Sequence, residues 1–264
     1  MKYKTIRKFL SLLLVFLLIT ACSSNGGGTG GPSGTDEPIS PDSGLPVVGE
    51  GLCANAYFPV RQGATWTYKS TGGAAGDYEF TDTVSAVRDG GFTLTSTFSD
   101  LTRTQEWECK EEGLVALQLG GPTVATLSSE DIDLQLDVKN VSGVTFPSEI
   151  NAGDQWQHAL DFEGTMAIAG ETAEADGNVQ TNFTALGEES VTVPAGTFNA
   201  MKVQMDTALN ITVRVQGLAV PVTFSGSFNY WLVQGAGWVK ASGTGTVANT
   251  SFTETIELQS YNIP

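Results

Sequence analysis

The chain of 264 residues carries 29 Asp and Glu against 13 Lys and Arg, a formal net charge of −16 at pH 7. Such an acidic surface is repelled by phosphate backbones and by anionic lipid head groups, so nucleic acid is excluded as an expected partner. The single His and three Cys form no cluster with the spacing of a zinc or redox site, and no glycine-rich phosphate loop is present. We therefore expect neither a metal nor a cofactor, and we interpret the acidity as a solvated coat, with cations or basic partners as the alternative.

The first 21 residues have the order of charge and hydropathy of a secretion signal. Four basic residues within positions 1–8 precede Phe9–Ile19, an apolar segment of 11 residues. A helix that spans a membrane needs about 20 apolar residues, so we predict a signal peptide that is removed. Its removal leaves 9 Lys and Arg against 29 Asp and Glu, a net charge of −20 for the mature chain.

The signal ends in the sequence LITAC, at residues 18–22, which resembles the signal of bacterial lipoproteins. The resemblance implies cleavage before Cys22, attachment of a diacylglycerol to its sulfur, and acylation of the new terminus, with chains such as palmitate holding the protein at a membrane. Two or more chains are required because a single chain anchors only reversibly. Ser23 favours the outer membrane in bacteria with two membranes, and the outer leaflet of the cell membrane is implied otherwise. The alternative is an ordinary signal peptide that ends near a cysteine.

Residues 22–50 are predicted to form a disordered tether. Positions 23–50 contain eight Gly, five Ser and four Pro, with no aromatic residue and no periodicity. A segment of this composition has too little apolar surface to fold, and it leaves 51–264 as the folded domain. Cys53 and Cys109 are then the two remaining cysteines. An even pair in an exported protein favours a disulfide, which would close a loop of 57 residues and stabilise the fold by roughly 4 kcal/mol.

The predicted domain shows period-2 alternation of apolar and polar residues almost throughout, which is typical of half-buried strands. In 131–139, for example, Ile132, Leu134, Leu136 and Val138 alternate with polar side chains. The same pattern occurs at 92–98, 197–205, 210–215, 222–233 and 251–258. Breaks rich in Gly, Asp and Asn at 88–91, 175–178 and 234–237 predict turns. We therefore predict an all-β domain of about a dozen strands, mainly an antiparallel meander.

A short sequence pattern occurs twice in the domain. Phe58-Pro59 is followed by G-x-x-W ending at Trp66, and Phe146-Pro147 by G-x-x-W ending at Trp156. This repeated pattern predicts two similar halves, 51–145 and 146–264, with chance recurrence as the alternative.

Three stretches together resemble a group of bacterial β-rich lipoproteins that share turn and strand motifs. They are YFPVRQGATWTY at 57–68, VTVPAGTFNAMKV at 191–203 and YWLVQGAGWVK at 230–240. Some members of the group look like the LolA and LolB lipoprotein carriers, whose half-open barrels hold acyl chains in a hydrophobic concavity. The resemblance implies a curved sheet or half-open barrel, with a β-sandwich as the alternative fold. A fold does not by itself establish a function.

Residues that could carry catalysis are few. His158 is the only histidine and no G-x-S-x-G motif is present, so we predict no Ser-His-Asp triad and a structural or solvent-facing role for this side chain. Glu106 and Glu108 alternate with Trp107 and are expected on the opposite, solvated face of a strand. A pair of carboxylates as in glycosidases remains an alternative, although no pair is singled out. We therefore assign no catalytic residue.

Two acidic stretches and one apolar run are candidate binding sites. Residues 128–137 and 174–178 offer oxygen ligands for calcium, but neither matches a known calcium loop. Leu218–Val222 is apolar and contains a proline, which favours an edge strand or the lip of a pocket. Four of the five Trp, at strand ends, are expected to pack in the core.

The sequence therefore favours a non-enzymatic, membrane-anchored extracytoplasmic lipoprotein that binds an apolar ligand, a lipid or another protein of the cell envelope. A structural or adhesive surface module is the main alternative. A hydrolase with an Asp/Glu pair is the third hypothesis.

Overall fold

The computed structural model describes residues 49–74, 76–99, 101–119, 132–168, 171–215, 217–247 and 250–264, with the side chains of 132–134, 166–168 and 171 left out. The predicted signal 1–21, Cys22 and the tether up to residue 48 lie outside these residues. So do positions 128–131 of the first candidate calcium stretch. All of the described strands belong to one compact unit.

The described chain contains one short 3₁₀ helix, η1 (Gly51–Cys53), followed by thirteen strands in a single sheet. The strands are β1 (Thr65–Gly73), β2 (Gly76–Arg88), β3 (Gly91–Thr97), β4 (Thr102–Lys110), β5 (Gly113–Ala116), β6 (Ile132–Gly143), β7 (Phe146–Pro147), β8 (Gln155–Ile168), β9 (Glu171–Val193), β10 (Gly196–Val215), β11 (Leu218–Val233), β12 (Gly237–Val247) and β13 (Thr250–Asn262). Within this part of the chain, no helix has the length and apolar character needed to span a membrane.

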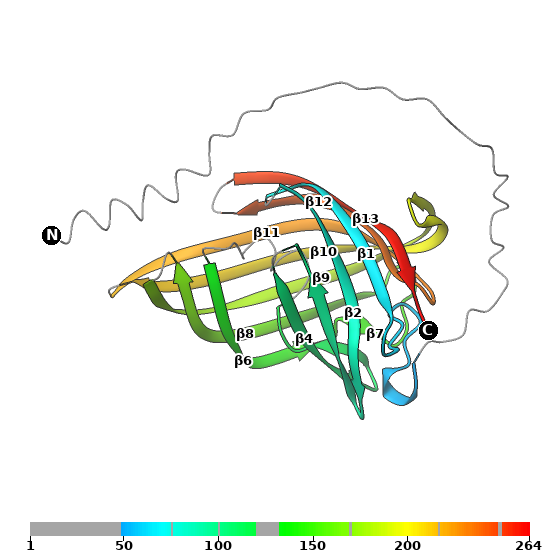
Figure 1. Cartoon of the computed structure of the whole chain (residues 1–264), viewed down its shortest axis with the longest axis horizontal. Helices are drawn as coiled ribbons and strands as arrows, with labels where there is room; N and C mark the ends of the chain where they lie inside the picture. Colours follow the sequence, from blue (N-terminus) through cyan, green and yellow to red (C-terminus); the bar gives the residue numbers. More distant parts are fainter. Residues whose placement is uncertain are drawn as a thin grey trace, which may run out of the picture. The chain divides into compact units, whose positions relative to one another are not determined.

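The sheet is antiparallel and strongly curled. Its strand order is β6-β8-β9-β10-β11-β12-β13-β1-β2-β3-β4-β5-β7, so most neighbours in the sheet are also neighbours in sequence. The exception that organises the fold is the pairing of β1 with β13, in which Thr65 lies opposite Asn262. Figure 1 shows the sheet bending round as a half-barrel, so that β8 and β9 come to face β2 and β4. The predicted all-β meander and half-open barrel are confirmed, and the alternative of two packed sheets is wrong because all thirteen strands share one sheet.

Buried and exposed side chains alternate along the strands, so the sheet has one inward and one outward face. In β2, Phe80, Asp82 and Val84 are buried and the residues between them are not. Strand β10 joins the two predicted strands 197–205 and 210–215 into one strand of 20 residues. The alternation continues through the junction, because Thr207 and Leu209 are buried while Asp206 and Ala208 are exposed.

The turn predicted at 175–178 is wrong, because these residues lie inside β9. A Cβ atom on Gly177 would lie 2.1 Å from the carbonyl oxygen of Asn210 on the neighbouring strand and 3.0 Å from the ring of Phe162. The glycine therefore permits close packing in the middle of the sheet. Turns do occur in the two other predicted breaks, where Gly90 and Gly235 adopt positive φ angles of 71° and 74°.

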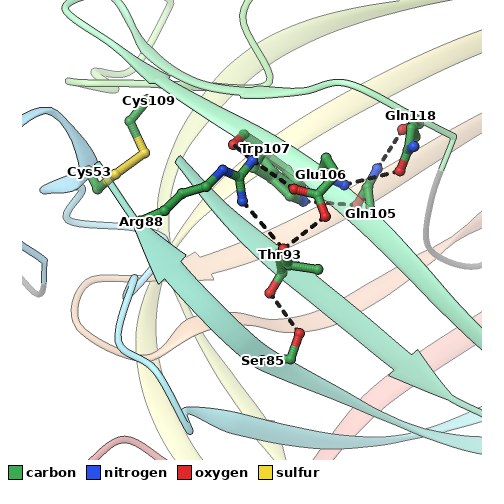
Figure 2. A network of polar contacts seen from close by, with 9 residues as sticks. All are labelled: Cys53, Ser85, Arg88, Thr93, Gln105, Glu106, Trp107, Cys109 and Gln118. Carbon is green, nitrogen blue, oxygen red and sulfur yellow. Dashed lines mark hydrogen bonds and ion pairs between the residues drawn. A yellow bond between two sulfur atoms is a disulfide. The ribbon is translucent and has the colours of Figure 1, made fainter. Parts of the chain in front are cut away.

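The core lines the concave side of the sheet in three clusters. The largest joins β1–β5 to β9–β13 and contains an aromatic stack in which the rings of Phe58 and Phe92 lie 5.4 Å and 5.3 Å from that of Trp107. A disulfide between Cys53 and Cys109 fastens η1 to β4 beside this cluster. It lies close to Trp107, as Figure 2 shows.

Candidate ligand-binding cavity

The concave side of the sheet contains a partly open cavity of about 200 Å³. Its wall comes from β2–β5 and β7 on one side and from β8–β12 on the other, so the curling of the sheet creates it. Seven of the described lining residues are Phe, Tyr or Trp, and they include Trp107, Trp156 and Trp238. Of the four strand-end tryptophans that the sequence analysis places in the core, Trp66 and Trp231 belong to the largest buried cluster, whereas Trp156 and Trp238 line this cavity.

Hydrogen bonds and ring contacts hold the aromatic wall in place. The indole Nε1 of Trp107 donates to Gln105 Oε1 at 3.0 Å, and Gln105 Nε2 donates to the carbonyl of Gln118 at 2.6 Å, as drawn in Figure 2. On the other side, the ring of Tyr230 meets that of Trp238 edge-on at 5.6 Å. A wall fixed by such contacts keeps its shape without a ligand.

Asp82 is the one carboxylate among the described residues that line the cavity. Its side chain is only 7% exposed, and its Oδ1 accepts a hydrogen bond of 2.5 Å from Ser96 Oγ. Burial disfavours the charged form and raises the pKa of Asp82 to about 6, against a smaller lowering effect of the Ser96 hydrogen bond. A buried group with a displaced pKa in a cavity is a candidate functional residue.

The sequence contains a signal for Asp82. The alternation of β2 places position 82 on the same face as Phe80 and Val84, and a carboxylate at an inward position of a strand is uncommon. The pattern alone could therefore have marked Asp82 as a candidate.

His158 also lines the cavity, from β8. It is 7% exposed, and its Nε2 lies 2.9 Å from the carbonyl oxygen of Ala116. Since a carbonyl only accepts, Nε2 carries the proton and donates it to this bond. Burial lowers the pKa of His158, opposed by the hydrogen bond to Ala116, so the ring is neutral at pH 7. Of the two predicted roles, the structural one fits, because His158 ties β8 to the end of β5.

A second buried carboxylate, Glu254 of β13, lies near the cavity without forming part of its described wall. Its Oε1 accepts hydrogen bonds from Ser70 Oγ at 2.5 Å and from Tyr78 Oη at 3.0 Å. Both Glu254 and Asp82 raise the pKa of the Tyr230 hydroxyl, although burial is the larger cause. Tyr230 therefore stays protonated and lies within the electric field of both carboxylates.

Glu106 and Glu108 lie on the outer face of β4, away from the cavity. Glu106 pairs with Arg88 at 2.6 Å and accepts a hydrogen bond of 2.8 Å from Thr93, as Figure 2 shows. Glu108 pairs with Lys110 at 3.0 Å. Both carboxylates are more than a third exposed, so they form surface ion pairs rather than a catalytic pair.

The other stretches singled out in the sequence lie elsewhere. Asp176 forms an ion pair with Arg214, and Asn178 accepts a hydrogen bond from Asn210, so the stretch 174–178 is engaged within the sheet. Groups of three or more metal-binding side chains are not found among the residues that the structure describes.

The apolar run 218–222 forms the far end of the β10–β11 hairpin. Leu218 is 67% exposed, and β11 pairs with β12 only from Phe224 onward, so within the described residues this edge of the run has no partner strand. The run does not line the described wall of the cavity, so it is not the lip of this pocket.

A wider groove of about 810 Å³ lies over β9–β13 and is lined mainly by hydroxyl and amide side chains. Asp206 is its one charged residue within the described part of the chain, and Gln204 donates a hydrogen bond to it. This groove lacks the enclosure and the aromatic wall of the inner cavity, which is therefore the stronger candidate site.

The DUF3108-like family model matches residues 103–243, more than half of the chain. The chain belongs to the DUF3108-like family. In this DUF3108-like protein, the matched segment contributes the cavity wall from β4 through β12, whereas Asp82 and Ser96 lie on strands that precede it. Among curated proteins, none matches the chain.

Solved structures from three bacteria have similar folds. A Bacteroides fragilis protein described as exported and as having a YmcC-like fold is 17% identical, and the match covers 79% of this chain and 100% of that one with a TM-score of 0.47. A Parabacteroides distasonis protein described as a lipoprotein is 16% identical over 79% and 99% of the two chains, also with a TM-score of 0.47. The hypothetical lipoprotein YmcC from Escherichia coli is 8% identical over 76% and 85%, with a TM-score of 0.34. Likenesses this distant carry no argument about function.

Proposed function

We propose that this DUF3108-like protein is a non-enzymatic lipoprotein, anchored at Cys22 on the extracytoplasmic side of a bacterial membrane, which binds a small ligand with an apolar body inside its curled sheet. The observation that carries the binding function is the inner cavity, with its aromatic side chains and the one carboxylate, Asp82, among its described lining residues. The anchor and the location are supported by the signal, the LITAC sequence and the tether.

The volume of the cavity limits the ligand. Pockets for drug-sized molecules measure roughly 300–1,000 Å³, and an apolar cavity of about 150 Å³ holds benzene. The cavity of about 200 Å³ thus accommodates one ring with a short substituent, or the end of one acyl chain. A whole lipid exceeds this volume, which makes a small ligand the better fit than the acyl chains carried by LolA and LolB.

Chemistry at this site has little support. His158 uses Nε2 in its bond to a backbone carbonyl, so this nitrogen is not available to activate a nucleophile. The cavity is also too small for a polysaccharide between two carboxylates. A hydrolase is therefore not favoured.

The test is binding of small aromatic probes to the mature chain. Indole and toluene should bind in a ratio of one to one by native mass spectrometry and raise the melting temperature. Replacing Val179, which lines the cavity, by Phe should abolish both effects because the new ring fills the space. The matched variant Val220→Phe, at a position that is 37% exposed on the β10–β11 hairpin, should leave both unchanged. No binding to the original protein, or equal binding to Val179→Phe, would contradict the proposal.

A structural or adhesive module remains the second candidate, supported by the exposed apolar end of the β10–β11 hairpin. Crosslinking in intact cells separates the two functions. A structural module would crosslink to one envelope protein through this hairpin and would bind no probe.

A further inference from the structure

We propose that the ligand of this cavity carries a protonated amine, with its ammonium group against Asp82 and its apolar body against the aromatic wall. The inference rests on the proposed binding function and names the chemical class of the ligand.

The Asp82 carboxylate lies in an environment that favours a positively charged ligand. Within the described part of the chain, its hydrogen bond comes from Ser96 Oγ to Oδ1, and Asp82 takes part in none of the ion pairs. Burying 93% of a carboxylate destabilises the fold, because one hydrogen bond compensates only part of the lost hydration and no positive partner supplies the rest. A ligand with a positive charge would supply that compensation.

The described lining of the cavity supplies no positive charge to Asp82. Glu254 is the other buried carboxylate nearby, and the described lining contains no Lys or Arg. His158 is neutral because burial lowers its pKa. Arg103 lies opposite Ser96 in the pairing of β3 with β4, but it does not line the cavity and is not among the causes that shift the pKa of Asp82. The cavity is therefore an electronegative space.

The aromatic side chains of the cavity wall also favour a cation. Tyr230 and Trp238 line the same cavity as Asp82, and the faces of such rings attract cations. An ammonium group also needs hydrogen-bond acceptors, and a carboxylate and a phenol oxygen both provide them. An anionic ligand would meet repulsion from Asp82, and a neutral one would leave the carboxylate without a partner.

The test compares three probes that share one ring and a similar short chain: 2-phenylethylamine, 2-phenylethanol and phenylacetate. Calorimetric titration of the mature chain at pH 8 should give an affinity for the amine at least tenfold above that for the alcohol, with phenylacetate the weakest. Asp82→Asn should lower the affinity for the amine at least tenfold and leave that for the alcohol unchanged. Asp206→Asn, a matched change in the outer groove, should alter neither.

A measurement on the unaltered protein keeps the test independent of the variant's folding. The advantage of the amine over the alcohol should shrink between pH 7 and pH 5, as the carboxylate takes up a proton, while binding of the alcohol stays constant. Equal affinities for the three probes at pH 8, or an advantage of the amine that is as large at pH 5 as at pH 7, would overturn the amine assignment and leave the binding function standing. Failure of all three probes to bind would overturn the binding function itself.

Discussion

Replacing Asp82 by Asn should stabilise the folded protein at neutral pH. Asparagine has nearly the same shape, and its Oδ1 can accept the hydrogen bond that Ser96 donates to the carboxylate. The change removes only the buried charge. Because no positive side chain of the described chain pairs with that charge, the protein loses no ion pair in return.

The size of the effect follows from the pKa of Asp82, which burial raises from 3.8 to about 6. Between these two values the folded protein holds one proton more than the unfolded chain. The free energy of unfolding therefore falls as pH rises through this range, and the full loss is present above about pH 6. A shift of roughly 2 pKa units corresponds to about 3 kcal/mol. Since the asparagine amide is also costly to bury, we expect a gain of about 1–3 kcal/mol at pH 8.

Urea unfolding of the mature chain and of Asp82→Asn at half-unit steps from pH 4 to pH 8 measures this difference. The two free energies should be similar near pH 4 and diverge up to about pH 6, after which their separation is constant. Asp206→Asn, at an exposed carboxylate, should show no such divergence. The reasoning is refuted if Asp82→Asn is less stable than the original protein at pH 8, because the carboxylate would then have a stabilising partner.

Three further predictions concern the frame around the cavity and the anchor. Changing Cys53 and Cys109 together to Ser should lower the free energy of unfolding by about 4 kcal/mol in urea, since the disulfide closes a loop across 56 positions; an unchanged value would show that the bridge adds nothing. Phe162→Ala should cost about 3–5 kcal/mol because this ring is 2% exposed, whereas Leu218→Ala should cost less than about 0.5 kcal/mol, and equal losses would contradict the described core. Cys22→Ser should abolish incorporation of a palmitate analogue and move the protein from the membrane to the soluble fraction on ultracentrifugation; retention in the membrane would refute the lipid anchor.

The strands and their inward faces could be predicted because alternation is a local property. Every second residue of β2 or β10 must face the core whatever the rest of the sheet does. The predicted break at 175–178 failed for a non-local reason: the glycine there accommodates Asn210 and Phe162, which are distant in sequence. A glycine in the sequence does not by itself show whether the chain turns there or whether a neighbouring strand or side chain packs close to its backbone.

The cavity could not be predicted, because a packed core and a cavity wall have the same sequence pattern. Leu94 on β3 and Val179 on β9 are both inward-facing apolar residues, and only the curvature of the sheet decides whether they touch or leave a space. Tryptophans at strand ends carry the same ambiguity. A charged residue at an inward position does not separate the two cases either, because Asp82 lines the cavity whereas Glu254, also buried, does not.

The pairing of β1 with β13 determines when the fold can be completed. Thr65 meets Asn262 across the sheet, so the first strand keeps an open edge until the last strand has been synthesised. Contacts between residues so far apart in sequence form slowly, because the entropy of closing the intervening chain is lost before they form. A ribosome-bound chain therefore lacks this strand until Thr250–Asn262 have emerged. For a protein exported as we propose, this delay favours translocation in an unfolded state, with the sheet completed only beyond the membrane.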